Sequence, residues 1–223
     1  MHQNLIQRFE NSCLMVMDQQ ADGYVFLGSA FLIDSEGYLL TAAHILENAH
    51  NPILISPAQP GVFTPLIVES SHTYSFSLVE TDPEHNVALL KMEGTWELGG
   101  PGDIIGNPET AREGLHLLTF GVSFGHFRIH NVMVMQSMLS AKVVSQNESN
   151  LLVFDSLVHP GDIGGALVNT EKGRVLGIIQ GTFDPFQIQR LEPPENYDLP
   201  SNLSYAVSIE YAKPLLEAQG IAI

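Results

Sequence analysis

The chain has 223 residues, of which 44% are hydrophobic and 15% charged, which suits one large globular domain or two small ones. The formal net charge is −16, from 25 acidic and 9 basic residues. Such a surface repels phosphate backbones and anionic headgroups, so nucleic acid and membrane are excluded as expected partners. No apolar stretch approaches the ~20 residues that a membrane-spanning helix needs.

Cys13 is the single cysteine, so no disulfide can form within the chain. It lies in the apolar run 13–17, which predicts a buried small side chain and not a reactive thiol. The first ten residues have neither the basic start nor the apolar core of a signal peptide. We therefore expect a cytoplasmic protein, with the periplasm as the alternative if a leader has been removed.

Short apolar and β-branched runs, separated by turn residues, follow one another along most of the chain. Strands are predicted at 14–18, 24–34, 38–42, 53–56, 66–69, 76–81, 87–92, 115–121, 132–144, 151–156, 166–169, 175–182 and 204–207. Helices are predicted only near the two ends, at 4–11 and 210–218. The pattern predicts an all-β protein made of two six-stranded antiparallel barrels.

Turn residues also indicate how the chain is divided. Gly99, Gly100, Pro101 and Gly102 predict a loop between the barrels. We therefore predict an N-terminal barrel over residues 1–98 and a C-terminal barrel over residues 99–223. The proline-rich stretch 184–202 predicts a second, exposed loop.

Four sequence blocks stand in a fixed order along the chain. They are GSAFLI (28–33) with GYLLTAAH (37–44), DPEHNVALLK (82–91), DSLVHPGDIGGALVN (155–169), and YAVSI (205–209) with YAKPLL (211–216). Together they resemble the trypsin-like serine proteases: the strands that lead to the catalytic histidine, the aspartate segment, the nucleophile loop, and the closing strand and helix. The sequences of these blocks are most similar to those of the HtrA/Deg branch, and the resemblance spans residues 8–217.

The resemblance places His44 at the catalytic histidine, Asn86 at the aspartate and Ile163 at the nucleophilic serine. Isoleucine has no lone pair to attack a carbonyl and no proton to give a base. In a well-studied protease, loss of the nucleophile lowers turnover ~10⁶-fold. Asparagine in place of the aspartate lowers it ~10⁴-fold and holds the imidazole in the wrong tautomer. The resemblance therefore implies a degenerate triad in which His44 alone is retained.

Other reactive groups lie near these positions in the sequence. Thr41 and Ser156 carry the nearest hydroxyls, and we interpret both as structural. Asp82 and Glu84 belong to the turn before a strand, and their register puts them out of reach of His44. In that same turn, we predict His85 to be exposed.

We expect the substrate-binding features of the fold to be retained. The resemblance implies oxyanion-hole-like backbone N–H groups at Gly161 and Ile163. It also implies a peptide groove with an apolar pocket, formed by Leu157, Gln180, Gly181 and Thr182. The alternative is a closed cleft in which Ile163 packs against His44.

His126 and His130 are four residues apart and would share one face of a strand. No third ligand is evident, so we predict no metal site and no cofactor.

These observations favour a catalytically inactive trypsin-like protease homologue that binds a protein or an extended peptide as a scaffold module. One alternative is an active hydrolase with an unrecognised nucleophile or an activating partner. Another is one subunit of a larger complex.

Overall fold

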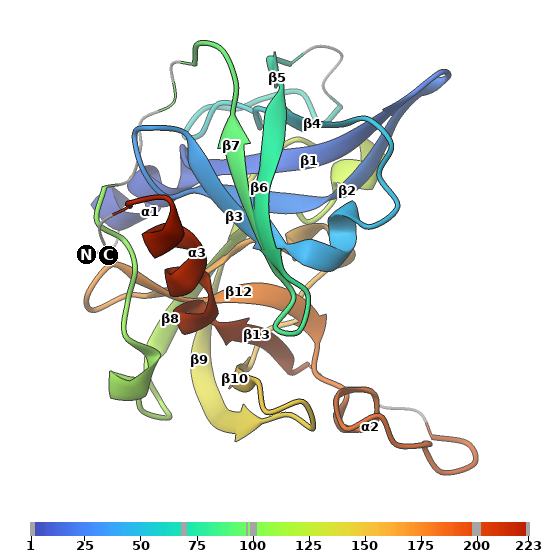
Figure 1. The fold of residues 1–223 in the computed structure, drawn as a ribbon, viewed down its shortest axis with the longest axis vertical. Coiled ribbons are helices and arrows are strands. Elements are labelled where there is room, and N and C mark those ends of the chain that lie inside the picture. The colour runs from blue at the N-terminus through green and yellow to red at the C-terminus, as the bar shows by residue number, and fades with distance from the viewer. Residues whose placement is uncertain (1–2, 68–70, 97, 99–101, 198–201, 222–223) are drawn as a thin grey trace.

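The computed structural model describes residues 3–67, 71–96, 98, 102–197 and 202–221, and strands dominate it (Figure 1). The strands are β1 (Cys13–Gln20), β2 (Gly23–Leu32), β3 (Tyr38–Ala42), β4 (Pro52–Ile55), β5 (Thr73–Tyr74), β6 (Phe76–Asp82), β7 (Val87–Met92), β8 (His116–Gly121), β9 (Met133–Val144), β10 (Asn150–Phe154), β11 (Ala166–Asn169), β12 (Arg174–Thr182) and β13 (Ser204–Ser208). The helices are α1 (Gln3–Glu10), α2 (Pro185–Ile188) and α3 (Lys213–Ala218), with short 3₁₀ turns between strands.

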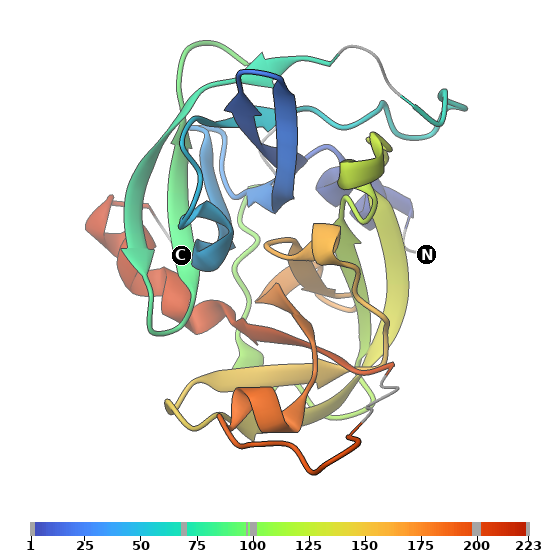
Figure 2. The ribbon, with the colours of Figure 1, turned by 90° about the vertical axis from the view of Figure 1, so that its right-hand side faces the viewer.

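The strands form two antiparallel units, which lie one above the other in Figure 1. The first is a seven-stranded sheet in the order β5-β4-β1-β2-β3-β7-β6. The second is a closed barrel in the order β10-β13-β12-β11-β8-β9. Figure 2 shows the same two units from the side.

Period-two alternation divides the side chains of strand β7 between two cores. In β7, Ala88 and Leu90 point into the first unit, whereas Val87 and Leu89 point toward the second. Both sets are fully buried, because successive side chains of a strand face opposite sides and here both sides are covered. The continuous apolar run at this strand therefore reflects two packed faces.

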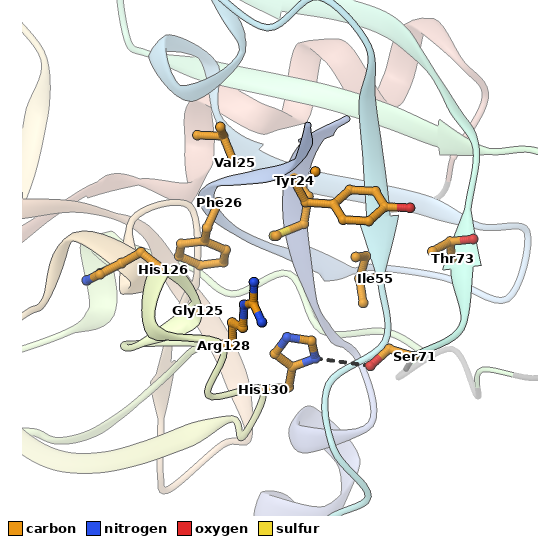
Figure 3. Close-up of a pocket in the computed structure, with 12 residues that line it drawn as sticks. Tyr24, Val25, Phe26, Ile55, Ser71, Thr73, Gly125, His126, Arg128 and His130 are labelled. Atoms are coloured by element: carbon orange, nitrogen blue, oxygen red, sulfur yellow. Dashed lines mark hydrogen bonds between the residues drawn. The ribbon is translucent and has the colours of Figure 1, made fainter. Parts of the chain in front are cut away.

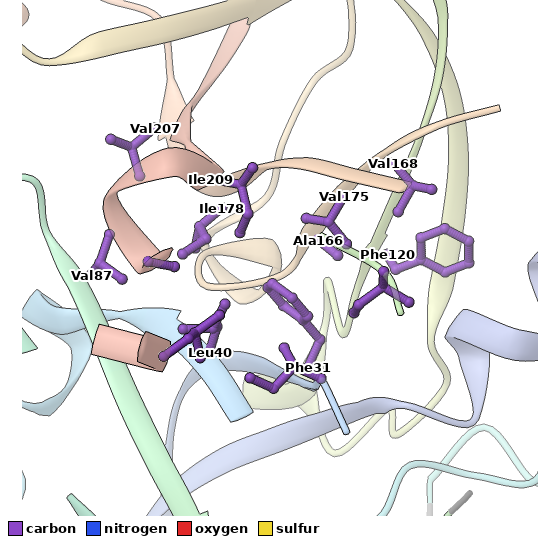
Figure 4. Packing of buried hydrophobic residues seen from close by; sticks show 14 of the residues in the cluster. Phe31, Leu40, Val87, Phe120, Ala166, Val168, Val175, Ile178, Val207 and Ile209 are labelled. Atoms are coloured by element: carbon purple, nitrogen blue, oxygen red, sulfur yellow. The ribbon is translucent and has the colours of Figure 1, made fainter. Parts of the chain in front are cut away.

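The core between the two units is the largest apolar cluster. Figure 4 shows Phe31 and Leu40 of the first unit facing Phe120, Ala166 and Ile178 of the second. Each fully buried Leu, Ile or Phe side chain of this core contributes roughly 1.5–3 kcal/mol of hydrophobic stabilisation. The two units are therefore held in one relative position, and that position brings the loops of the candidate site together.

The predicted fold class is confirmed, and the differences are local. The first unit has seven strands because the segment 73–82 forms two strands, β5 and β6, on either side of Ser75. β5 pairs with β4, whereas β6 pairs with β7. No strand forms at Leu66 and Ile67, and the rest of the run predicted at 66–69 lies outside the described residues. The loop predicted at 184–202 contains the one-turn helix α2, which is capped by the Asp184 carboxylate.

Candidate active site

His44 and Asn86 come from separate turns of the first unit and meet at its end. His44 lies in the 3₁₀ turn Ala43–Leu46 directly after β3, and its side chain is exposed. Asn86 ends the turn between β6 and β7 with a φ of 58°. Asparagine tolerates this left-handed conformation better than most residues. The backbone amide of Ala43 donates to the carbonyl of Asn86 at 3.2 Å, which fixes the two turns against each other.

Asn86 contacts His44 through both polar atoms of its side chain. Its Oδ1 accepts the backbone N–H of His44 at 2.8 Å. Its Nδ2 lies 2.7 Å from Nδ1 of the imidazole. A backbone N–H can only donate, so the amide oxygen must face it and the NH₂ group must face the ring. The ring nitrogen Nδ1 therefore accepts, and the neutral imidazole carries its proton on Nε2.

Gln180 completes this set from the second unit. Its side chain is buried, and its Oε1 accepts Asn86 Nδ2 at 2.5 Å. Its Nε2 donates to the backbone carbonyl of Asn86 at 3.3 Å. Sequence reasoning placed Gln180 in the peptide groove, whereas its amide here is turned inward and orients Asn86.

Ile163 follows the 3₁₀ turn Pro160–Asp162 and is half-buried. Its side chain packs on the core of the first unit, which includes Ala42 and Ile45 on either side of His44 in the sequence. Its backbone N–H donates to the carbonyl of Pro160 at 3.4 Å. This N–H is therefore engaged inside its own turn, although an oxyanion donor has to be free to bind.

Gly164 shows how tightly this loop fits the first unit. Its φ is +86°, and an added Cβ would lie 2.1 Å from the carbonyl oxygen of Ser29 and 2.2 Å from Oγ1 of Thr41. Only glycine fits this position. Gly161 is pressed in the same way against the backbone carbonyls of Val122 and Ser123.

Ser29 organises the loop, and sequence reasoning missed it. It is fully buried on β2, its hydroxyl donates to the Gly161 carbonyl at 2.7 Å, and it accepts the Val122 N–H at 2.9 Å. Its backbone N–H donates to the carbonyl of Ile163 at 2.8 Å. A serine inside the apolar run 28–33 is the signal that could have identified it, because a buried hydroxyl needs partners.

Asp162 is a fully buried carboxyl group beneath the loop. It accepts the hydroxyl of Ser123 at 2.7 Å and the N–H of His159 at 2.9 Å. Desolvation raises its pKa despite these hydrogen bonds. Cys13 is buried, as predicted, and burial together with the charge of Asp162 raises its pKa to about 12, which makes the thiol inert.

The alternative catalytic groups are engaged elsewhere. Thr41 is buried and donates its hydroxyl to the carbonyl of Ser29 at 2.6 Å. The Asp82 carboxylate contacts His85 Nδ1 at 2.6 Å. The prediction that His85 is exposed is wrong: its side chain is 20% exposed and stacks on the ring of Tyr211 at 3.6 Å between centroids. The stacking arises because the turn before β7 rests on the 3₁₀ turn 209–212.

The other predicted site residues lie around one end of β12. Leu157 is 52% exposed and Thr182 is exposed, whereas Gly181 is half-buried. β12 pairs with β11 only as far as Ile178, but with β13 as far as Thr182. The side of Gly181 and Thr182 that faces away from β13 therefore has no partner among the described strands.

His126 and His130 do not form a pair of metal ligands. His126 is exposed and contacts the rings of Phe26 and Phe127, whereas His130 is buried beside Ser71. Among the described residues there is no cluster of three or more potential metal-ligating side chains.

Residues 28–178 match the family profile described as the trypsin-like peptidase domain. The chain therefore belongs to this family. It is 32% identical over 155 residues to a probable periplasmic serine endoprotease DegP-like from Pseudomonas putida, an alignment that covers 68% of this chain and 28% of the relative. It is 27% identical over 156 residues to the serine protease HTRA1 of Xenopus tropicalis, which covers 68% of this chain and 30% of the relative.

Solved structures show the same fold. An HtrA-type protease AlgW with a tripeptide matches with a TM-score of 0.71 and 22% identity, over 98% of this chain and 63% of that chain. The serine endoprotease from Yersinia pestis matches with a TM-score of 0.69 and 22% identity, over 98% and 66%. These structures share the trypsin-like fold, and the relatives to which the chain is similar are HtrA- and DegP-type proteases. No helix in the described parts of the chain is long and apolar enough to cross a membrane.

Proposed function

We propose that this HtrA-like domain is catalytically inactive and binds extended polypeptide. Three observations support inactivity. Ile163 provides no hydroxyl, Asn86 presents an NH₂ group and not a carboxylate to His44, and the Ile163 N–H donates to Pro160. The chain spans about 28% of the curated relatives it matches, so their activity cannot be assigned to it by similarity.

The observation that carries peptide binding is the open edge of β12. Phe183 donates its N–H to Leu203 of the β13 side at 2.9 Å. Because alternate residues of a strand point to opposite edges, the N–H and C=O of Thr182 face away from β13. An extended peptide can add to such an edge through main-chain hydrogen bonds. Leu157 would supply apolar contact for one of its side chains.

The test uses a six-residue apolar peptide and two versions of it that are N-methylated at alternate positions, one in each register. Binding is measured by fluorescence anisotropy. We expect the N-methylated version that lacks the pairing N–H groups to bind about 10-fold more weakly or worse, because each lost main-chain hydrogen bond weakens the edge pairing. Equal binding of all three peptides would show that β12 is not the docking edge.

The same samples test inactivity. The chain is incubated for a long time with the peptide and, separately, with an unfolded protein as a test substrate. We expect mass spectrometry to show that both substrates remain uncleaved. Turnover that disappears in His44→Ala would instead establish an active hydrolase. Turnover that is unaffected by His44→Ala would come from a contaminating protease and would leave the proposal standing.

We propose a protein or peptide partner and no nucleic-acid or membrane partner, because the net charge of −16 disfavours both of the latter. Our expectation for this chain is the cytoplasm, whereas the names of the DegP-like relatives place those proteins in the periplasm. Fractionation of cells that express the protein from its own locus distinguishes the two compartments.

A further inference from the structure

A second concave site lies beside the β1–β2 hairpin and shares no residue with the His44, Asn86 and Ile163 site. Its volume is about 810 Å³, within the range of ~300–1,000 Å³ typical of pockets for organic ligands. Figure 3 shows Phe26 next to Gly125, with Arg128 and His130 on one side of the pocket and Tyr24 and Ile55 on the other. The lining residues are Met17, Gly23, Tyr24, Val25, Phe26, Ile55, Ser71, Thr73, Gly125, His126, Arg128 and His130.

Arg128 provides a cation in this pocket. The residue is exposed, and its guanidinium makes no hydrogen bond or ion pair with any residue in the described ranges. Its backbone is fixed, because its N–H donates to Gly125 at 3.0 Å and its φ is 62°. No described lining residue is acidic, although the chain has 25 acidic residues. The guanidinium is therefore available to an anion from outside the chain.

His130 adds a buried donor next to it. The residue is only 8% exposed, and its Nδ1 lies 3.0 Å from the hydroxyl of Ser71. Burial lowers its pKa, which favours the neutral ring at physiological pH. When the Ser71 hydroxyl donates to Nδ1, the ring proton is on Nε2, which bonds to no described residue and is a donor for a ligand.

The rest of the pocket wall is apolar. Met17, Phe26 and Ile55 line it. An added Cβ on Gly125 would lie 2.4 Å from the Phe26 ring, so glycine at 125 lets that ring close on the loop. Tyr24 and Val25 remain about half exposed at the rim, at 51% and 45%. A ligand with hydrocarbon as well as charge would cover this surface.

We propose that this pocket binds an organic carboxylate: its anionic head pairs with Arg128 and His130, and its apolar body lies along Met17, Phe26 and Ile55. One arginine with one neutral donor matches a singly charged carboxylate, for which the guanidinium fork has the right geometry. The carboxylate can belong to a free aliphatic acid or to the C-terminus of a polypeptide with apolar last residues. The site is independent of the peptide edge at β12.

Isothermal titration calorimetry with four probes tests the proposal. Octanoate is compared with octanamide, and acetyl-Leu-Leu with a free carboxyl group is compared with its C-terminal amide. We expect at least one acid to bind and its amide to bind about 10-fold more weakly or worse, because only the acid pairs with Arg128. Preference for octanoate would identify a free acid, and preference for the dipeptide a polypeptide terminus.

The matched variants are Arg128→Gln and Arg112→Gln, since Arg112 is also exposed but does not line the pocket. We expect Arg128→Gln to weaken binding of the acid about 10-fold or more and Arg112→Gln to leave it unchanged. Three results would overturn the proposal: no binding of either acid at millimolar concentration, equal binding of acid and amide, or equal loss in both variants.

Discussion

Asn86 holds His44 at two points, with Oδ1 on the backbone N–H at 2.8 Å and Nδ2 against the ring nitrogen Nδ1 at 2.7 Å. Gln180 holds the same amide from the second unit. The imidazole is therefore oriented with its Nε2 as donor and not as acceptor. A protonated ring would place Nδ1–H against the NH₂ group, where no acceptor is available.

The tautomer of His44 is the first prediction. Long-range ¹H–¹⁵N NMR on protein labelled at histidine should show the Nε2–H form for His44, with His44→Gln used to assign the signal. In Asn86→Asp a carboxylate oxygen replaces Nδ2, so the Nδ1–H form should dominate, because the carboxylate accepts that proton. An Nδ1–H tautomer in the native protein would contradict the amide orientation.

Ser29 is predicted to stabilise the nucleophile-type loop. Ser29→Ala leaves the Val122 N–H and the Gly161 carbonyl without their buried partner, which costs about 1–3 kcal/mol of unfolding free energy. Ser77, an exposed serine on β6, is the matched control, and Ser77→Ala should change stability by less than about 0.5 kcal/mol. Urea unfolding measures both, and equal effects would mean that the hydroxyl of Ser29 does not stabilise the loop.

Alanine substitutions at Gly164 and Gly114 distinguish the cost of a steric clash from the cost of backbone strain. Both have a φ of +86°, but an added Cβ would lie 2.1 Å from a carbonyl oxygen at Gly164 and meets nothing within 4 Å at Gly114. Gly114→Ala should therefore cost about 1–2 kcal/mol from strain alone. Gly164→Ala should cost about 3 kcal/mol more, or prevent folding, because the loop has to leave the first unit. Similar melting temperatures of the two variants would argue against the close packing of the loop.

Asp162 gives a pH-dependent prediction. Its folded pKa is raised, so its contribution to stability is fully present below the unfolded pKa and is lost as pH rises through the folded pKa. Asp162→Asn removes this loss of stability at higher pH because an amide does not ionise, while the amide oxygen still accepts the His159 N–H. The unfolding free energy of the variant, relative to the native protein, should therefore rise from about pH 4 to pH 7. A difference that is constant over this range would show that the carboxyl group does not titrate with a raised pKa.

The four sequence blocks indicated the fold through their resemblance to the trypsin-like proteases. The strands could be predicted because turn residues and apolar runs are local signals. The contacts between the two units were not predictable in this way. Ser29 and Gly161 are 132 positions apart, and no local pattern links a serine on β2 to that carbonyl. His85 was misjudged for the same reason, since its stacking partner Tyr211 comes from the other end of the chain. Side chains at turns acquire their burial from distant elements, which composition and periodicity do not encode.

Labelling by a serine-directed fluorophosphonate probe tests the central claim, that the site lacks a nucleophile, most directly. The variant Ile163→Ser with Asn86→Asp serves as the positive control, because it restores a hydroxyl and a carboxylate in the same backbone. We expect the double variant to be labelled and the native protein to remain unmodified by intact-mass analysis. Stoichiometric labelling of the native protein that is lost in His44→Ala would contradict the account.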